Sequence, residues 1–129
     1  MADLGSYLAK HAEPAVAGII LALAGGASAI AAEIRMPATS LDEAAGAVNA
    51  DGDTQKKLDV IADDIVLEVL AGTGVASYLS EERDAAVPVD PEGAMIVACD
   101  PLDGSSNIGV NVSVGTIFSP VSYTHLRAH

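Results

Sequence analysis

The segment from Asp100 to Asn107, which reads Asp-Pro-Leu-Asp-Gly-Ser-Ser-Asn, carries the oxygen-rich groups best suited to chemistry. Asp100 and Asp103 supply two carboxylates three residues apart, and a proline stiffens the turn between them. The backbone carbonyl of Leu102 lies between the two carboxylates and offers a third oxygen. Hard cations such as Mg²⁺ prefer oxygen ligands of these kinds. The spacing therefore indicates a divalent cation site in this segment.

The three residues that follow, Gly104, Ser105 and Ser106, suit an anion. Glycine leaves backbone N–H groups unhindered and the serines add two hydroxyls, so this turn is suited to a phosphate group. A cation and a phosphate side by side are what metal-assisted phosphoryl transfer requires. The alternative, from residue types alone, is an acidic surface turn capped by serines, because Asp-Pro and Asp-Gly are common turn formers.

Acidic residues are concentrated in the middle of the chain. The net charge is −12, and the stretch from residue 42 to residue 103, with fifteen acidic and three basic residues, accounts for all of it. Most of these carboxylates are expected on a solvated surface, and a few are expected to converge on a cation. Such a charge argues against a nucleic acid or an anionic membrane as partner. The single cysteine, Cys99, excludes an intrachain disulfide and fits a reducing compartment.

Two long helices are expected before the first strand. Apolar residues recur at helical spacing from Val16 to Ile34, and Pro37 ends this pattern. A second stripe, from Leu58 to Val69, is expected to follow Asp53 as its N-cap and to end at Gly72. The uncharged stretch 14–32 approaches the length of a membrane span. Its glycines and the negative charge before it favour instead a helix packed against other helices or subunits.

Three strands are expected to place the chemistry at one edge of a sheet. The first, 75–80, leads into Glu81 and Glu82, and the second, 95–99, leads directly into Asp100. Alternating valines predict the third at 110–114. Helices followed by strands indicate a layered α+β or α/β domain.

Four blocks of the sequence, in the same order, resemble the active-site blocks of class I fructose-1,6-bisphosphatases. They are Asn49–Asp53, Lys56–Val60, Ser80–Glu82 and the signature block Asp100–Phe118. The likeness runs from about the first helix to Phe118, nearly the whole chain. A lone Asp-Pro-x-Asp-Gly turn points only to the wider lithium-sensitive sugar and inositol phosphatase superfamily. Four ordered blocks make the narrower assignment specific.

The resemblance implies a role for each block. It implies that two or three Mg²⁺ ions, for which Mn²⁺ can substitute, are bound by Glu81, Glu82, Asp100, Asp103 and the carbonyl of Leu102. Asp59 matches the general base that activates water, and Asp53 matches a residue that helps to polarise that water. Glu82 is counted with these two as a catalytic residue. The 1-phosphate of the sugar is held by Asp103, Gly104, Ser105 and Ser106.

The same resemblance implies a fold and a reaction. The fold is the N-terminal part of the fructose-bisphosphatase and inositol-phosphatase-like sugar phosphatase fold, truncated, with two long helices packed on a mixed sheet. The reaction is hydrolysis of D-fructose 1,6-bisphosphate to fructose 6-phosphate and orthophosphate, in gluconeogenesis or the photosynthetic Calvin cycle. The parent protein is expected to be a cytoplasmic homo-oligomer, a tetramer, that binds a sugar bisphosphate and neither nucleic acid nor membrane. Residues 18–32 are expected at a subunit contact.

Both the length and the end of the chain depart from that family. Family members are longer, and their later part contributes a further metal-binding acid, the 6-phosphate pocket and much of the sheet. We therefore expect residues 1–120 to be the N-terminal portion of the domain and the chain alone to have little or no activity. Residues 121–129 are expected to be a non-native tail, because the family pattern stops there. His125 and His129 have helical i, i+4 spacing, but a metal pair there carries little weight.

Three other functions remain open from the sequence. Sedoheptulose-1,7-bisphosphatase activity, or a dual specificity, would use the same residues, because the discriminating sugar contacts lie beyond this chain. An inositol-monophosphatase-like enzyme is disfavoured by the run Ser105–Ile108. A third alternative, of another class, is a non-catalytic remnant that binds metal or phosphate, or an interaction module that uses the first helix.

Overall fold

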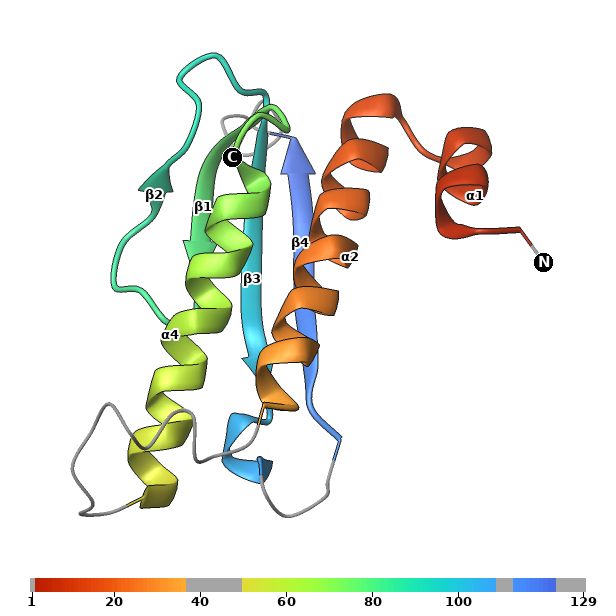
Figure 1. Ribbon diagram of the computed structural model, residues 1–129. Helices are drawn as coiled ribbons and strands as arrows, with labels where there is room; N and C mark the ends of the chain where they lie inside the picture. Colours follow the sequence, from red (N-terminus) through yellow and green to blue (C-terminus); the bar gives the residue numbers. More distant parts are fainter. Residues whose placement is uncertain (1, 37–49, 109–112, 123–129) are drawn as a thin grey trace.

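The computed structural model describes residues 2–36, 50–108 and 113–122 (Figure 1). Its elements are three α-helices, one 3₁₀ turn and four strands within those ranges. The helices are α1 (Leu4–His11), α2 (Pro14–Ile34) and α4 (Ala50–Leu70), and the 3₁₀ turn η1 is Ser105–Asn107. The strands are β1 (Val75–Ser80), β2 (Val87–Pro88), β3 (Met95–Asp103) and β4 (Gly115–Ser122).

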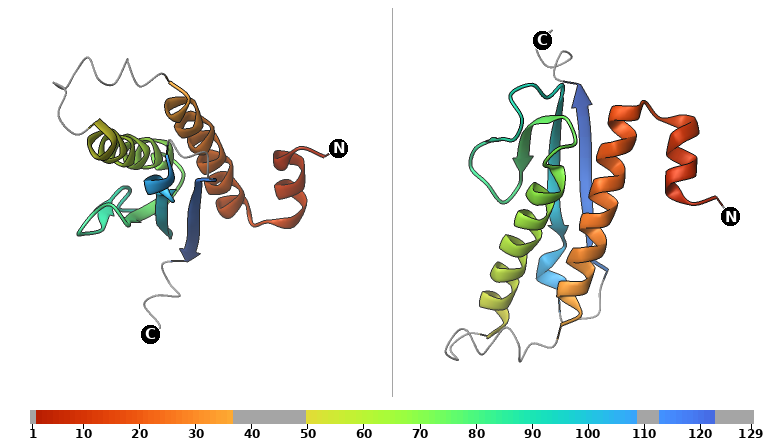
Figure 2. Two further views of the ribbon diagram at one scale, coloured as in Figure 1. Left: turned by 90° about the horizontal axis from the view of Figure 1, so that it is seen from below. Right: turned by 45° about the horizontal axis from the view of Figure 1, so that its top comes forward.

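The strands form one mixed sheet in the order β2-β1-β3-β4. β1 and β3 run parallel, whereas β2 pairs with β1 and β4 pairs with β3 in the antiparallel sense. The helices α2 and α4 lie side by side across one face of this sheet, and α1 stands outside them against α2 (Figures 1 and 2). This arrangement confirms the predicted α+β fold with two long helices packed on a mixed sheet.

The core lies between the helix pair and the sheet. α2 buries one stripe of residues, Ile19, Leu23, Gly26 and Ile30. Against that stripe pack buried residues of α4 and of the central strands, namely Leu58, Ala62, Val66, Leu70, Val75, Tyr78, Met95, Val97 and Cys99. Burying these side chains removes apolar surface from water and holds the two layers together.

Helix α2 is also the one helix of the described ranges that is long and apolar enough to cross a membrane. Its mean hydropathy reaches 2.1, and it meets this criterion by length and composition only. In this structure its buried stripe contacts α4, and Leu21 on its other side is exposed. The predicted helix packed against another helix is therefore observed, together with an open apolar face.

The predicted elements and the observed ones differ at several ends. The second long helix was predicted to start after Asp53 as its N-cap, but α4 begins at Ala50 and includes Asp53 in its first turn. The prediction was wrong because an aspartate is favourable within the first turn as well as at the cap, where the helix carries partial positive charge. The side chains of residues 50–53 lie outside the described part.

The short helix α1 was not predicted, although its cap is visible in the sequence. The Asp3 carboxylate accepts a hydrogen bond from the Ser6 N–H at 2.8 Å, as an N-cap does. The edge strand β2 was likewise not predicted. Its Pro88 is tolerated because an edge strand leaves one side without a ladder partner.

Strand β1 confirms the predicted range 75–80, and β3 contains the predicted range 95–99 and continues to Asp103. The third predicted strand, 110–114, is wrong where it can be compared. Residues 110–112 lie outside the described part, Ser113 and Val114 have no regular structure, and β4 begins at Gly115. β4 pairs along β3 from Asp103 to Met95, so the partner strand, rather than the local valine alternation, sets its position.

Candidate active site at the carboxyl end of the sheet

Parallel pairing of β1 and β3 brings their carboxyl ends to the same edge of the sheet. The register joins Ser80 to Cys99, so the residues that follow each strand become neighbours. The N-terminal half of α4 and the turn η1 lie at this same end of the molecule (Figure 1). The described parts of the four sequence blocks that were predicted to form a site therefore belong to elements that reach this end of the sheet.

The acidic turn after β1 is held by backbone hydrogen bonds. The Glu81 N–H donates to the carbonyl of Cys99 at 3.0 Å, which extends the parallel ladder by one residue. The Glu82 N–H donates to Ser80 Oγ at 3.1 Å, and the Arg83 N–H donates to the carbonyl of Ser80 at 3.2 Å. Both glutamates are exposed. The turn thus presents two carboxylates on a backbone that is tied to the sheet.

The end of β3 supplies the next two carboxylates. Asp100 is half-buried, and its Oδ1 accepts a hydrogen bond from the Leu102 N–H at 3.3 Å. Leu102 itself is buried, whereas Asp103 is exposed at the end of the strand. The register between β3 and β4 shifts between Asp100 and Asp103, so the ladder is irregular at the predicted cation segment.

The predicted phosphate turn follows immediately. Gly104 has a φ of 81°, a left-handed conformation that glycine adopts without steric cost. Its carbonyl accepts the Asn107 N–H at 2.8 Å and closes the 3₁₀ turn η1. Ser105 Oγ accepts a hydrogen bond from Gln55 Nε2 at 3.2 Å, and this bond ties the turn to α4. Gln55 was not predicted as a site residue, although it lies between Asp53 and Asp59 in the sequence.

Asp59 is half-buried on α4, and its Oδ1 is fully buried. Within the described part of the chain this oxygen has no hydrogen-bond partner. A buried polar atom without a partner is rare in native proteins and marks a place where a ligand, water or ion belongs. This observation makes Asp59 a candidate site residue.

The charges of these carboxylates act on one another. Partial burial raises the pKa of Glu82 above its ordinary value, and the negative charges of Asp59, Glu81, Asp100 and Asp63 raise it further. Partial burial likewise raises the pKa of Asp100, and the charge of Asp103 adds to the effect. Mutual repulsion of this kind is what a bound cation relieves.

Within the described residues, no three side chains of the types His, Cys, Asp and Glu lie close enough together to hold a metal ion as they stand. The donor set nevertheless fits a hard divalent cation. Every candidate donor is an oxygen, one carboxylate oxygen on Asp59 is buried and unpartnered, and the group as a whole is short of positive charge. The side chain of Asp53, the remaining predicted catalytic residue, falls outside the described part.

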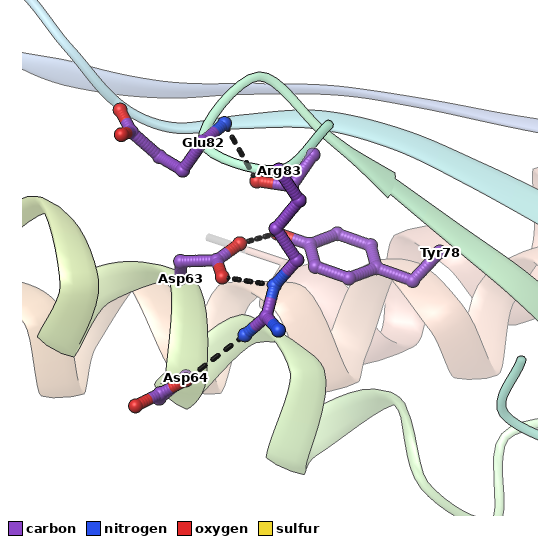
Figure 3. A network of polar contacts seen from close by, with 6 residues as sticks. Asp63, Asp64, Tyr78, Glu82 and Arg83 are labelled. Atoms are coloured by element: carbon purple, nitrogen blue, oxygen red, sulfur yellow. Dashed lines mark hydrogen bonds and ion pairs between the residues drawn. The ribbon is translucent and has the colours of Figure 1, made fainter. Parts of the chain in front are cut away.

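A network beside the acidic turn was not foreseen from the sequence (Figure 3). The Arg83 guanidinium donates through Nε to Asp63 Oδ2 and through Nη2 to Asp64 Oδ1, and Tyr78 donates through its hydroxyl to Asp63 Oδ1. The available signal was that Arg83 stands directly after Glu82. From the sequence, Arg83 is only one of the three basic residues in the acidic stretch 42–103.

A pocket of about 440 Å³ opens beside the acidic turn. It is lined by residues of β1, β3 and β4, including Glu81, Asp100 and Ile117. Ile117 is exposed on the face of the sheet that the helices do not cover. The pocket therefore lies on the uncovered face of the sheet, with Glu81 and Asp100 among its lining residues.

Comparison with known proteins agrees with this geometry. The chain is 66% identical over 71 residues to a protein named fructose-1,6-bisphosphatase class 1 from Paracoccus denitrificans, a match that covers 55% of this chain and 22% of the relative. It is 47% identical over 118 residues to a protein of the same class from Bradyrhizobium sp. (strain BTAi1), a match that covers 90% of this chain and 34% of that relative. The chain thus spans about a third, or less, of the length of these relatives.

The fold shows the same relationship. The crystal structure of Leishmania major fructose-1,6-bisphosphatase in holo form superposes with a TM-score of 0.76 and 26% sequence identity, over 98% of this chain and 40% of that chain. The family described as fructose-1-6-bisphosphatase, N-terminal domain, matches residues 5–126. Four ordered motif blocks, the mixed sheet with its helix pair and these matches lead to one conclusion: the chain belongs to the fructose-1,6-bisphosphatase N-terminal domain family.

Proposed function

We propose that this chain forms the metal- and phosphate-binding part of an enzyme that hydrolyses the 1-phosphate of D-fructose 1,6-bisphosphate and yields fructose 6-phosphate and orthophosphate. One observation carries the proposal. The charges of carboxylates from α4, from the turn after β1 and from the end of β3 together raise the pKa of Glu82, and the glycine–serine turn at residues 104–106 follows directly after β3. The family membership supports the substrate class.

In this proposal Glu81, Glu82, Asp100 and Asp103, with the carbonyl of Leu102, hold the divalent cations, which are Mg²⁺ or, as a substitute, Mn²⁺. Bound cations of this kind make water more acidic and neutralise charge that develops on phosphoryl oxygens. Repulsion among the acidic groups supports the assignment, because it lowers the cost of bringing a cation into the site.

Asp59 is proposed as the general base, with Asp53 and Glu82 assisting it. The buried Oδ1 of Asp59 supports this role, because it accepts no hydrogen bond from the residues that the structure describes and can accept a proton from water. A general base must lie within hydrogen-bond reach of the proton that it removes.

The turn at residues 103–106 is proposed to hold the 1-phosphate through Asp103, Gly104, Ser105 and Ser106. The left-handed Gly104 lets the backbone turn sharply after β3. Gln55 positions Ser105 by donating to its hydroxyl oxygen, and this leaves the serine proton available for a phosphate oxygen.

Titration calorimetry with Mg²⁺ and Mn²⁺ tests the metal site. The variant Asp103→Ala is expected to bind both ions more weakly than the unchanged chain, because it removes one proposed ligand. Glu13→Ala is a matched control, since Glu13 is an exposed acid before α2 that makes no side-chain capping bond. Equal affinity of the unchanged chain and Asp103→Ala would contradict the proposal and favour a module that acts through α2.

The chain by itself is expected to release little or no phosphate from fructose 1,6-bisphosphate. It spans 34% or less of the two relatives described above, so the rest of the substrate pocket has no counterpart in it. A colorimetric phosphate assay with Mg²⁺ measures this, and clear metal-dependent release would contradict the expectation. A chimera that carries residues 5–122 within the Paracoccus denitrificans relative is expected to be active. A panel of fructose and sedoheptulose bisphosphates on that chimera then tests the substrate.

The proposal also covers the cellular location and the oligomeric state of the protein. We propose a cytoplasmic homo-oligomer, a tetramer, with residues 18–32 of α2 at a subunit contact. The buried thiol of Cys99 supports the cytoplasmic location, and the exposed apolar side chain of Leu21 on α2 supports the subunit contact. Residues 121–129 remain a proposed non-native tail, although β4 continues through Ser122 and the family match extends to residue 126. Light scattering on the chimera, with and without the substitution Leu21→Lys, tests the subunit contact.

A further inference from the structure

Asp63 is the one buried charged residue in the described part of the chain, with 3% of its surface exposed. Both of its carboxylate oxygens are used. Oδ1 accepts a hydrogen bond from the Tyr78 hydroxyl at 2.9 Å, and Oδ2 accepts one from Arg83 Nε (Figure 3). Burying a carboxylate is costly unless it is paired and hydrogen-bonded. Asp63 therefore depends on Arg83 and Tyr78 for its place in the core.

Arg83 reaches two successive residues of α4. Its Nε contacts Asp63, and its Nη2 contacts Asp64 Oδ1 at 2.9 Å. The Asp64 side chain is 66% exposed, so water and salt screen the outer contact, whereas the inner contact ends on the buried carboxylate. A planar guanidinium donates in fixed directions, so its orientation is set by the two contacts together.

The same arginine ends the acidic turn. Its backbone N–H donates to the carbonyl of Ser80 on β1, and its side chain is anchored on α4. The residues between these two anchors are Glu81 and Glu82. The turn is therefore tied to the strands by its backbone N–H groups and to the helix by the Arg83 side chain, and its two carboxylates lie between these attachments.

We propose that Arg83 and Asp63 are positioning residues, which hold the Glu81–Glu82 turn against α4 so that its carboxylates stay beside Asp59. The inference rests on the proposed metal site. Without such an anchor, the negative charges of Asp59, Asp63 and Asp100 would push Glu82 away from the helix. The attachment through Arg83 opposes that repulsion and also neutralises Asp63.

A positioning role of Arg83 and a simple charge effect predict opposite changes in cation affinity when Arg83 is replaced. Removing a positive charge from an acidic site raises its affinity for a cation if electrostatics alone matter. Losing the anchor lowers that affinity, because the two glutamates no longer converge. The sign of the change therefore separates a positioning role from a simple charge effect.

The test is calorimetric titration of this chain with MnCl₂, for the unchanged protein and for Arg83→Gln. The affinity of Arg83→Gln is expected to fall by about 10- to 100-fold, the usual loss when a group that orients metal ligands is removed. Arg83→Lys keeps the charge but loses the two-pronged contact, and an intermediate loss is expected. Lys10→Gln, on the exposed face of α1, removes an equal charge far from the site and is expected to leave the affinity unchanged.

A second readout does not depend on metal. Hydrogen exchange of the amides of Glu82 and Arg83 is expected to accelerate in Arg83→Gln, while exchange in the middle of α4 stays the same. Circular dichroism of each variant shows that the helices are intact.

The outcomes separate this inference from the proposed function. An unchanged chain that binds no Mn²⁺ overturns both. Binding by the unchanged chain that is equally tight, or tighter, in Arg83→Gln and Arg83→Lys overturns the positioning role alone. Weaker binding in both variants, with faster exchange in the turn, supports it.

Discussion

Two carboxylates on adjacent turns of α4 have different environments. Asp63 has both oxygens satisfied by hydrogen bonds, whereas Asp59, four residues earlier on the same side of the helix, keeps a buried Oδ1 without a partner in the described chain. An unmet buried acceptor costs about 1–3 kcal/mol, so proteins rarely keep one without a use. The contrast indicates a structural role for Asp63 and supports the proposed catalytic role of Asp59.

The variant Tyr78→Phe is expected to destabilise the chain by about 1–3 kcal/mol, because it leaves Asp63 Oδ1 buried without its donor. Tyr78 is fully buried, and the ring itself is kept in the variant. Urea unfolding followed by circular dichroism measures the change in the free energy of unfolding. Tyr7→Phe is the matched control, because Tyr7 is 55% exposed and its loss of a hydroxyl should leave the free energy nearly unchanged. Similar losses in both variants would contradict this account of Asp63.

At the scale of elements, the contact between α2 and α4 sets how closely the helix layer packs. Gly26 lies buried at this contact, and a Cβ atom built there would come 3.1 Å from Cγ2 of Val69. Its neighbour Gly25 is exposed and has no atom within 4 Å of such a Cβ. The contact with Val69 therefore restricts the size of the residue at position 26, whereas position 25 has room for a side chain.

Gly26→Leu is expected to lower the free energy of unfolding by about 1–3 kcal/mol, because the added side chain must force α2 and α4 apart. Gly25→Leu, the same change one residue earlier, is expected to raise it by about 0.5–1 kcal/mol through better helix propensity. Thermal and urea unfolding of the two variants measure the difference. If both substitutions changed the free energy of unfolding by the same amount, the close approach of α2 and α4 at Gly26 would not restrict side-chain size there.

For the molecule as a whole, the fold brings several carboxylates to one end. The sequence carries a net charge of −12, and the turn after β1, the end of β3 and the first half of α4 all lie at the carboxyl end of the sheet. Like charges held close together disfavour the compact state. A ligand that binds only the folded state offsets that cost in proportion to its free concentration.

MgCl₂ is expected to raise the melting temperature of the chain more than NaCl does at equal ionic strength. At a Mg²⁺ concentration about 100 times the dissociation constant, binding to the folded state adds about 2.7 kcal/mol. Differential scanning calorimetry measures the shift, and a chelator should reverse it. The Asp103→Ala variant should show the same melting temperature in both salts. An identical shift in MgCl₂ and NaCl for the unchanged chain would mean that only general screening is at work.

Several elements follow from the sequence because their signals are local. The bounds of β1 and the run at the start of β3 follow from apolar stretches of strand length, and α2 follows from its helical periodicity. The start of α4 and the position of β4 do not, because a first-turn aspartate resembles a cap and because β4 takes its place from pairing with β3. Local pattern indicates the type of an element better than its ends.

The sequence by itself determined the family, the order of the four motif blocks and the residue types that suit a cation beside a phosphate. The tertiary structure alone decided which groups meet: Arg83 with Asp63, twenty residues earlier, and Gln55 with Ser105, fifty residues later. Residue periodicity indicates which side of an element faces the core, but it carries no information about which other element covers that side. That pairing depends on the parallel register of β1 and β3 and on the packing of α4 across them, which are properties of the folded chain.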